Sequence, residues 1–158
     1  MIVRNATPAD VPEIIDIWNA EIQSGFATFT TEAKTTDALI ARLQTPWPFL
    51  VAEASGQVAG FACVGKFRDG PGYKYTAEST IYLAPEAQGL GGGRLLMQEL
   101  ETRLRAQNIH TLIAAISGEN PDALGFHRSM GFENGGILPQ AGRKHKNWLD
   151  LHLLFKHL

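Results

Sequence analysis

Residues 81–93 read IYLAPEAQGLGGG, and this stretch decides the fold of the chain. A strand-like run ends before Pro85, a glycine-dense loop follows, and a helix with leucines at helical spacing comes next. A strand, a glycine-rich loop and a helix in this order present free backbone N–H groups and a positive helix end to a pyrophosphate. The stretch therefore predicts a binding site for a phosphate-bearing cofactor, with a glycine-rich turn that binds nothing as the alternative left open.

Two common phosphate-binding loops do not fit this stretch. A P-loop needs a lysine and then a serine or threonine after its last glycine, but Arg94 and Leu95 follow Gly93. A dinucleotide fingerprint that began at Gly89 would place Arg94 where a small residue must pack against the strand. Neither a nucleoside triphosphatase nor a Rossmann domain is therefore expected.

Length and composition indicate one self-contained unit. The chain has 158 residues, of which 44% are hydrophobic, so we expect a single domain over residues 1–158 with a core of its own. Fourteen basic and sixteen acidic residues give a formal net charge of -2. Because this balance creates no field that would draw the chain to nucleic acid or to an anionic membrane, neither is expected as a partner.

The single cysteine and the N-terminal residues indicate a cytoplasmic protein. Cys63 lies in an apolar run and has no second cysteine to pair with, which fits a reducing compartment. Residues 1–5 lack the basic start and the apolar stretch of a signal peptide, and no apolar run approaches the roughly 20 residues that span a bilayer.

Helix caps, turn residues and hydrophobic spacing predict eleven elements in the order β-α-α-β-β-β-α-β-α-β-β. Thr7-Pro8-Ala9-Asp10 begins the first helix and Ser24-Gly25 ends it, after which the aromatic and threonine-rich stretch 26–31 is expected to line a surface groove. The order predicts an α+β (mixed α/β) sheet with helices on both faces. The remaining elements are a short opening strand, a helix over 36–43, a hairpin over 48–64 turning at Ser55-Gly56, a strand over 80–83, a helix after Gly93, a strand over 110–116, a helix over 120–130, and strands over 132–138 and 148–155.

Residues 81–93 resemble the acetyl-CoA motif of the GNAT acetyltransferase superfamily, with its Gln/Arg-x-x-Gly-x-Gly/Ala signature. Asn120 and the segment 126–132 fall where that superfamily has its next motif, so the resemblance spans the whole chain. Residues 78–83, the helix ending in His127, and residues 142–150 resemble the phosphinothricin and methionine sulfoximine N-acetyltransferase subgroup.

The resemblance implies the GNAT fold, in which the central sheet is mixed and mostly antiparallel and two parallel strands splay apart to admit the pantetheine arm of acetyl-CoA. It implies that the backbone of one splayed strand and the turn after it bind this cofactor, while Asn120 and Ser129 bind the pantetheine arm or the phosphate end. The strand and turn residues so assigned are Ile81, Tyr82, Leu83, Gln88, Gly89, Leu90, Gly91, Gly92, Gly93 and Arg94.

The same resemblance implies three chemical roles, because attack of an amine on a thioester needs the amine neutral, the developing oxyanion stabilised and the leaving thiolate protonated. Glu78 matches the subgroup's acid by position and is assigned as general base, directly or through water. The Leu83 amide would polarise the carbonyl. His127 stands where the superfamily usually has a tyrosine, so it is either the general acid or a cofactor contact, and Tyr82 is a less well placed acid.

Substrate recognition is expected from the loop before Glu78. Arg68 suits a bidentate grip on a carboxylate or phosphinate, while Gly72, Tyr73 and Tyr75 would shape the pocket. This loop matches the subgroup only in part, because the subgroup's loop is more aromatic. Phe29, Trp47, Lys144 and Trp148 are further candidates for the pocket wall. The histidines come with no tight ligand set, so no metal is expected.

The resemblance as a whole implies an acetyl-CoA-dependent N-acetyltransferase that acts on the amino group of a small amino-acid-like substrate. Transfer would be direct, in a ternary complex, and the protein would be a homodimer. Two alternatives stay open: acetylation of protein N-termini or of polyamines, and a non-catalytic acyl-CoA-binding sensor.

Overall fold

The computed structural model describes all residues 1–158 and contains one seven-stranded sheet with strand order β1-β2-β3-β4-β5-β7-β6. The elements follow one another in the predicted order, with three short 3-10 turns between them. Their bounds are β1 (Ile2–Asn5), α1 (Val11–Ser24), α2 (Thr36–Leu43), β2 (Phe49–Ala54), β3 (Gln57–Lys66), β4 (Thr76–Leu83), α3 (Gly92–Ala106), β5 (Thr111–Ser117), α4 (Pro121–Ser129), β6 (Glu133–Lys144) and β7 (Asn147–His157).

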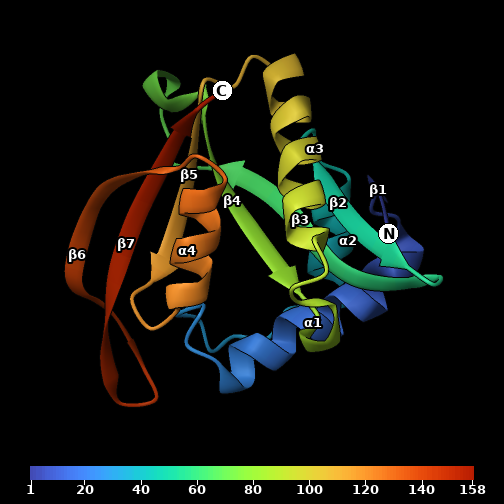
Figure 1. Cartoon of the computed structure of the whole chain (residues 1–158), viewed down its shortest axis with the longest axis horizontal. Helices are drawn as coiled ribbons and strands as arrows, with labels where there is room; N and C mark the ends of the chain where they lie inside the picture. The colour runs from blue at the N-terminus through green and yellow to red at the C-terminus, as the bar shows by residue number, and fades with distance from the viewer.

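The sheet is antiparallel except between β4 and β5, which run side by side in the same direction. This parallel pairing covers Thr76–Ser79 against Thr111–Ala114 and then stops, and beyond it the two strands diverge (Figure 1). The sheet is therefore mixed and mostly antiparallel with a splayed parallel pair, as expected.

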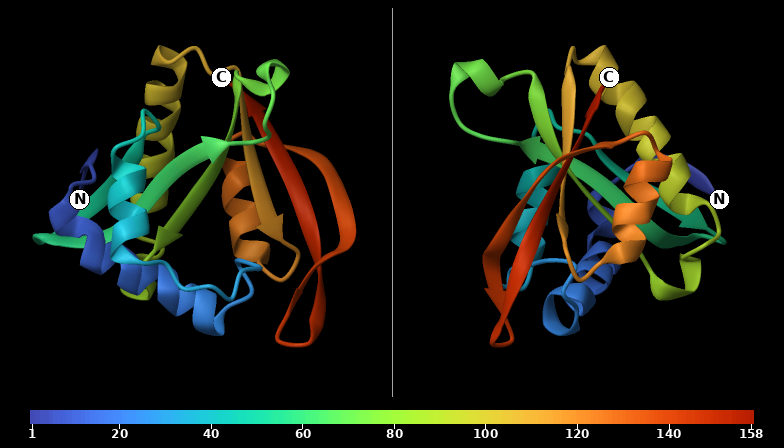
Figure 2. Two further views of the ribbon diagram at one scale, coloured as in Figure 1. Left: turned by 180° about the vertical axis from the view of Figure 1, so that it is seen from behind. Right: turned by 60° about the vertical axis from the view of Figure 1, so that its left-hand side comes forward.

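Two helices cover each face of the sheet (Figure 2). On one face, α3 and α4 bury a core that includes Leu96, Leu100 and Leu124. On the other, α1 and α2 bury a smaller core that includes Trp18 and Leu39. Within α1 and α3 the buried apolar side chains recur at helical spacing, as at Ile14, Trp18 and Ile22, which is why the sequence predicts these two helices.

The start of α1 follows the predicted cap, with one difference. The backbone N–H and the hydroxyl of Thr7 both donate to the Asp10 carboxylate, at 2.7 and 2.8 Å, and Arg4 donates to both oxygens of the same carboxylate. The first turn, Pro8–Asp10, is a 3-10 turn, and the α-helix begins at Val11. Asp10 therefore fixes how the chain enters α1.

Two strands are longer than predicted by four residues or more. β4 begins at Thr76 because the polar residues before Thr80 pair with both β3 and β5. β6 continues past Leu138 to Lys144, with shifts of register on the way, because β7 supplies a partner along its whole length. No helix of the chain has both the length and the apolar character needed to cross a membrane.

Candidate active site

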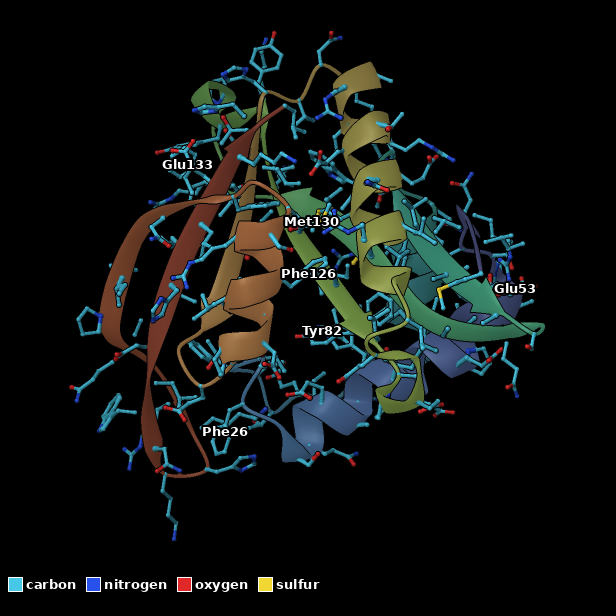
Figure 3. The ribbon with its side chains drawn as sticks, in the orientation of Figure 1. Phe26, Glu53, Tyr82, Phe126, Met130 and Glu133 are labelled. Atoms are coloured by element: carbon cyan, nitrogen blue, oxygen red, sulfur yellow. The ribbon has the colours of Figure 1, made fainter.

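A groove of about 1280 Å³ opens where β4 and β5 diverge. Its walls are β4, the turn after it, the end of β5, one side of α4, one side of α1 and the segment Phe26–Thr30. In Figure 3 the label of Tyr82 lies at β4 and that of Phe126 at α4, and Phe26 lies near the tip of the β6–β7 hairpin, where it meets His145. The groove thus brings together residues from both halves of the chain.

The diverging part of β4 offers backbone hydrogen-bonding groups to this groove. The amide of Ala84 donates to the carbonyl of Ala59 at 2.9 Å. Because every second residue of an antiparallel strand turns its N–H and C=O groups toward the partner strand, Tyr82 also directs these groups toward β3. Ile81 and Leu83 then direct their N–H and C=O groups to the side where β5 has moved away. An extended amide-bearing chain can pair with these two residues.

The turn after β4 has the conformation that an anion site needs. Gly89 and Gly91 have φ of 76° and 87°, which favours glycine, and a Cβ at either would meet nothing within 4 Å. Gly91 precedes α3 without any side-chain cap, so the first N–H groups of that helix stay free for a ligand. At Gly93 a Cβ would come within 3.3 Å of the Phe126 ring, so the helix start packs closely against α4.

Glu78 lies at the point where β4 and β5 begin to part, half-buried in the groove lining. Burial is the only cause that shifts the pKa of its carboxyl, and it raises that pKa above the ordinary range. By the alternation of β4, Glu78 shares the α1 face with Tyr82, while Ala77 faces α3 and α4. A half-buried carboxylate with no cation or hydrogen-bond donor beside it is suited to accept a proton.

His127 faces the groove from α4 and is only 4% exposed. Its Nδ1 donates to the Ala123 carbonyl at 2.8 Å, so in the neutral ring Nε2 is an acceptor. Burial lowers the pKa of His127, which the hydrogen bond to Ala123 only partly opposes. The rings of Phe126 and Phe132 meet it edge-on, each with a centroid separation of 5.1 Å. At neutral pH this ring accepts a hydrogen bond and has no proton to give from Nε2.

Comparison with known proteins agrees with this geometry. The acetyltransferase (GNAT) family matches residues 12–132, which is most of the chain. The chain belongs to the GNAT family. It is an acetyl-CoA-dependent N-acetyltransferase.

Three relatives of this acetyltransferase carry names or ligands that bear on its chemistry. A methionine sulfoximine/methionine sulfone acetyltransferase of Pseudomonas paraeruginosa is 37% identical over 94% of this chain and 90% of its own. A phosphinothricin N-acetyltransferase of Streptomyces viridochromogenes is 36% identical over 94% of this chain and 83% of its own. An acetyltransferase of Salmonella typhimurium, solved with acetyl-CoA, is 33% identical with a TM-score of 0.96, over 100% of this chain and 94% of its own.

The predicted cofactor residues fall into two groups, those that line the groove and those that lie outside its lining. Ile81, Tyr82, Leu83, Gln88, Gly89, Gly93 and Asn120 line the groove. Asn120 caps α4 with its side-chain oxygen, which accepts from the Ala123 amide at 3.1 Å. The other five lie outside the lining: Leu90, Gly91 and Arg94 are exposed and Gly92 is buried at the start of α3, while the hydroxyl of Ser129 donates to the Phe126 carbonyl at 2.7 Å within its own helix.

The predicted substrate loop lies apart from the groove of its own chain. Arg68, Gly72, Tyr73 and Tyr75 are exposed and do not line it. Arg68 stacks over the Tyr73 ring, 6.0 Å from its centroid. This loop precedes the paired part of β4, whereas the groove begins at Glu78. In one copy of this acetyltransferase, the four residues and Glu78 are not brought together.

The other candidates for the pocket wall divide as well. Phe29 lines the groove with its neighbours, since five of the six residues of the predicted 26–31 stretch do so, and Lys144 contacts that stretch from β6. Trp47 packs against the core between the sheet and α3, and Trp148 is 58% exposed on β7. Only the first two therefore bear on the groove.

Sequence reasoning missed the acidic character of the groove. Its lining contains no lysine or arginine but six carboxylates, namely those of Asp16, Glu21, Glu78, Glu86, Glu119 and Asp122. A signal for two of them was present in the first helix, where Asp16, Ala20 and Ser24 are spaced four residues apart and Glu21 adjoins them. Residues at that spacing share one side of a helix, and in the structure this side of α1 faces the groove.

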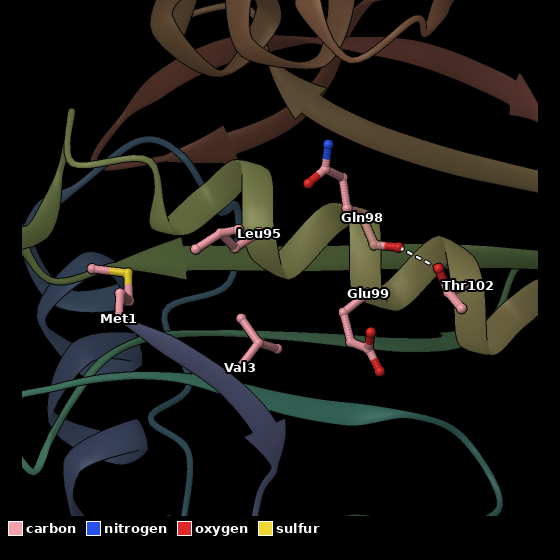
Figure 4. A pocket seen from close by; sticks show the side chains of 6 residues that line it. All are labelled: Met1, Val3, Leu95, Gln98, Glu99 and Thr102. Atoms are coloured by element: carbon pink, nitrogen blue, oxygen red, sulfur yellow. Dashed lines mark hydrogen bonds between the residues drawn. The ribbon is translucent and has the colours of Figure 1, made fainter.

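A second, smaller hollow of about 270 Å³ lies between β1 and α3 (Figure 4). Two of its polar side chains are already paired, since the Thr102 hydroxyl donates to the Gln98 carbonyl at 2.9 Å and Glu99 accepts from Arg103 at 2.6 Å. We assign no function to it. No group of three or more histidine, cysteine or acidic side chains is arranged to hold a metal ion.

Proposed function

We propose that this acetyltransferase transfers acetyl to the amino group of a small amino-acid-like substrate, of the kind named for its methionine sulfoximine and phosphinothricin relatives. The observation that carries the proposal is the half-buried carboxylate of Glu78, placed where the free edge of β4 begins. Substrate and cofactor would meet there in a ternary complex, with direct attack of the amine.

The groove residues divide the work of this reaction. Bound acetyl-CoA would supply an activated acetyl thioester. Ile81 and Leu83 would pair with its pantetheine arm, and the Leu83 N–H would polarise the carbonyl that is attacked. Glu78 would take the proton from the attacking amine, directly or through water. As the new N–C bond forms, the C–S bond of the thioester would break, and the thiolate that leaves would receive a proton through solvent. The N–H groups at the start of α3 would hold the pyrophosphate.

Of the two roles left open for His127, the geometry supports the contact role. The Nδ1 proton is committed to Ala123, and the lowered pKa keeps the ring neutral, so Nε2 would accept a hydrogen bond from the cofactor arm. Tyr82 is poorly suited to donate a proton, because burial raises its pKa to about 12.

One observation favours a second candidate function. Six carboxylates and no lysine or arginine line the groove, which suits a cationic amine without a carboxylate, such as a polyamine. The sensor alternative loses support from Glu78, because a protein that only binds acyl-CoA needs no unpaired carboxylate at this place. The relatives named as enzymes also favour turnover.

The test measures thiol release from acetyl-CoA with a panel of amines: methionine sulfoximine, phosphinothricin, ordinary amino acids, polyamines and short peptides. Turnover on the first three groups, reduced by about 10²-fold or more in Glu78→Gln, would support the proposal. Turnover on polyamines alone would move the conclusion to the second candidate. Acetyl-CoA binding without turnover on any amine would overturn both.

We also propose that the protein is a homodimer in the cytoplasm. Ile137, Leu138 and Trp148 expose between 50% and 58% of their surfaces on the outer strands β6 and β7, a place where a second copy could pack. The unpaired Cys63 fits a reducing compartment. Light scattering after size exclusion would measure the mass directly, and a monomeric mass at micromolar concentration would contradict the dimer.

A further inference from the structure

The segment Phe26–Thr30, which follows α1, forms one wall of the groove and has no regular secondary structure of its own. A wall without backbone ladders must be fixed by other contacts if it is to define the size of a pocket. One such contact comes from α1, where the Glu21 carboxylate accepts from the Ala27 amide at 3.0 Å. Further contacts come from the β6–β7 hairpin.

Lys144, near the end of β6, supplies the polar contact. It is 2% exposed, although most residues of that strand are open to solvent. Its Nζ donates to the Thr28 carbonyl at 2.9 Å and lies 3.5 Å from the Glu21 carbonyl. Burial lowers the pKa of Lys144, while the Glu21 carboxylate acts in the opposite sense. A buried ammonium is costly unless it is hydrogen-bonded, and both of its acceptors belong to the groove wall.

Two aromatic contacts accompany it on either side. Phe26 meets the His145 ring edge-on at a centroid separation of 5.6 Å. Phe29 lies so close to Gly142 that a Cβ on that glycine would overlap its ring. The hairpin therefore contacts the segment at Gly142, Lys144 and His145, and Lys144 is the one of these three that donates a hydrogen bond to it.

We propose that Lys144 is a positioning residue, which holds the Phe26–Thr30 segment against β6 and so sets the shape of the end of the groove that binds the amine. The inference rests on the proposed function of the groove as an amine site. It assigns to Lys144 no contact with either reactant. Lys144 would affect the reaction only by fixing the position of Thr28 and the rest of the Phe26–Thr30 segment.

The first test is kinetic and uses Lys144→Met, with each reactant varied at a saturating level of the other. We expect the KM for the amine to rise about tenfold, with kcat within about twofold of wild type and the KM for acetyl-CoA unchanged, because only the wall moves. Lys144→Arg keeps the charge and should return the amine KM to within about threefold of wild type. Gly142→Ala, which displaces Phe29, should raise the amine KM in the same way.

Lys156→Met is the matched control. Lys156 is also a lysine of the hairpin that donates to a carbonyl, that of Met130 at 2.7 Å, but it faces the core on the other side and pairs with Glu101. This variant should lower the midpoint of thermal unfolding and leave both KM values unchanged. If it raises the amine KM as much as Lys144→Met does, the effect is general loosening and the inference is overturned.

The second test needs no substrate and therefore separates this inference from the proposed function. Amide hydrogen exchange in the free protein should become at least tenfold faster at Ala27–Thr30 in Lys144→Met, with α4 unchanged. Unchanged exchange in that segment overturns the inference, whatever the enzyme acetylates. Faster exchange in a protein that acetylates no amine would support the positioning role and sink the proposed function alone.

Discussion

Asp10→Asn tests whether the ion pair at the start of α1 stabilises the fold through charge. The Asp10 carboxylate is 5% exposed and accepts two bonds from Arg4, at 2.7 and 2.8 Å, and two from Thr7. The Arg4 hydrogen bonds are the largest cause that lowers the pKa of Asp10, from 3.8 to about 2. At about 1.4 kcal/mol per pKa unit, this shift corresponds to roughly 2 kcal/mol of unfolding free energy at pH 7.

The sign of the pH dependence follows from the direction of that shift. Because the folded protein holds the proton of Asp10 less tightly than the unfolded chain, the stabilisation is present above about pH 4 and is lost as the pH falls toward 2. Urea unfolding of wild type and Asp10→Asn should differ by roughly 2 kcal/mol at pH 7 and by clearly less at pH 3. Thermal midpoints should differ by about 4–8 °C at neutral pH.

A control and a refuting result are available within the same network. Glu53 also pairs with Arg4, at 2.7 Å, but its side chain is 26% exposed, so Glu53→Gln should cost less than Asp10→Asn. If the difference between wild type and Asp10→Asn stays constant from pH 7 to pH 3, charge does not carry the effect. The loss would then come from geometry at the helix cap, and the electrostatic reasoning would be wrong.

Three further predictions concern the groove and the core. Because burial raises the pKa of Glu78 and a base must be deprotonated to act, kcat/KM should fall with decreasing pH through an apparent pKa above that of an ordinary glutamate, and Glu78→Gln should remove that limb. Gly91→Ala, at φ 87°, should cost about 1 kcal/mol of stability and weaken acetyl-CoA binding in calorimetry, whereas Gly56→Ala, at φ 79° in the β2–β3 turn, should cost as much stability with unchanged binding. Cys63 is fully buried with its pKa raised to about 11, so a thiol reagent should label it only after unfolding.

Local chemistry made the order of elements predictable. Pro8, Gly25 and Gly131 mark the ends of helices, because each restricts or frees the backbone at one position whatever surrounds it. Strand ends were harder to place, since β6 extends to Lys144 only because β7 runs beside it. Pairing with a distant strand leaves no signature in the strand itself.

In the candidate site, too, features that depend on one residue's own chemistry were predictable, and features that depend on folded contacts were not. The glycine turn was predictable, because glycine can adopt positive φ whatever surrounds it, and Gly89 and Gly91 both do so. The proton on His127 Nδ1 was not, because it depends on the Ala123 carbonyl one turn earlier in the folded helix. The position of Arg68 outside the groove was not predictable either, because nearness in sequence to Glu78 does not bring a loop into the groove.

The short ladder between β4 and β5 also has a mechanical consequence. Four residue pairs join these strands, whereas seven join β3 to β4 and seven join β5 to β7. The two halves of the sheet, β1–β4 and β5–β7, are thus joined by a ladder of only four pairs, with Glu78 beside it. A change in the angle between the two halves has fewer backbone pairs to disturb at this ladder than within the two ladders of seven pairs that flank it.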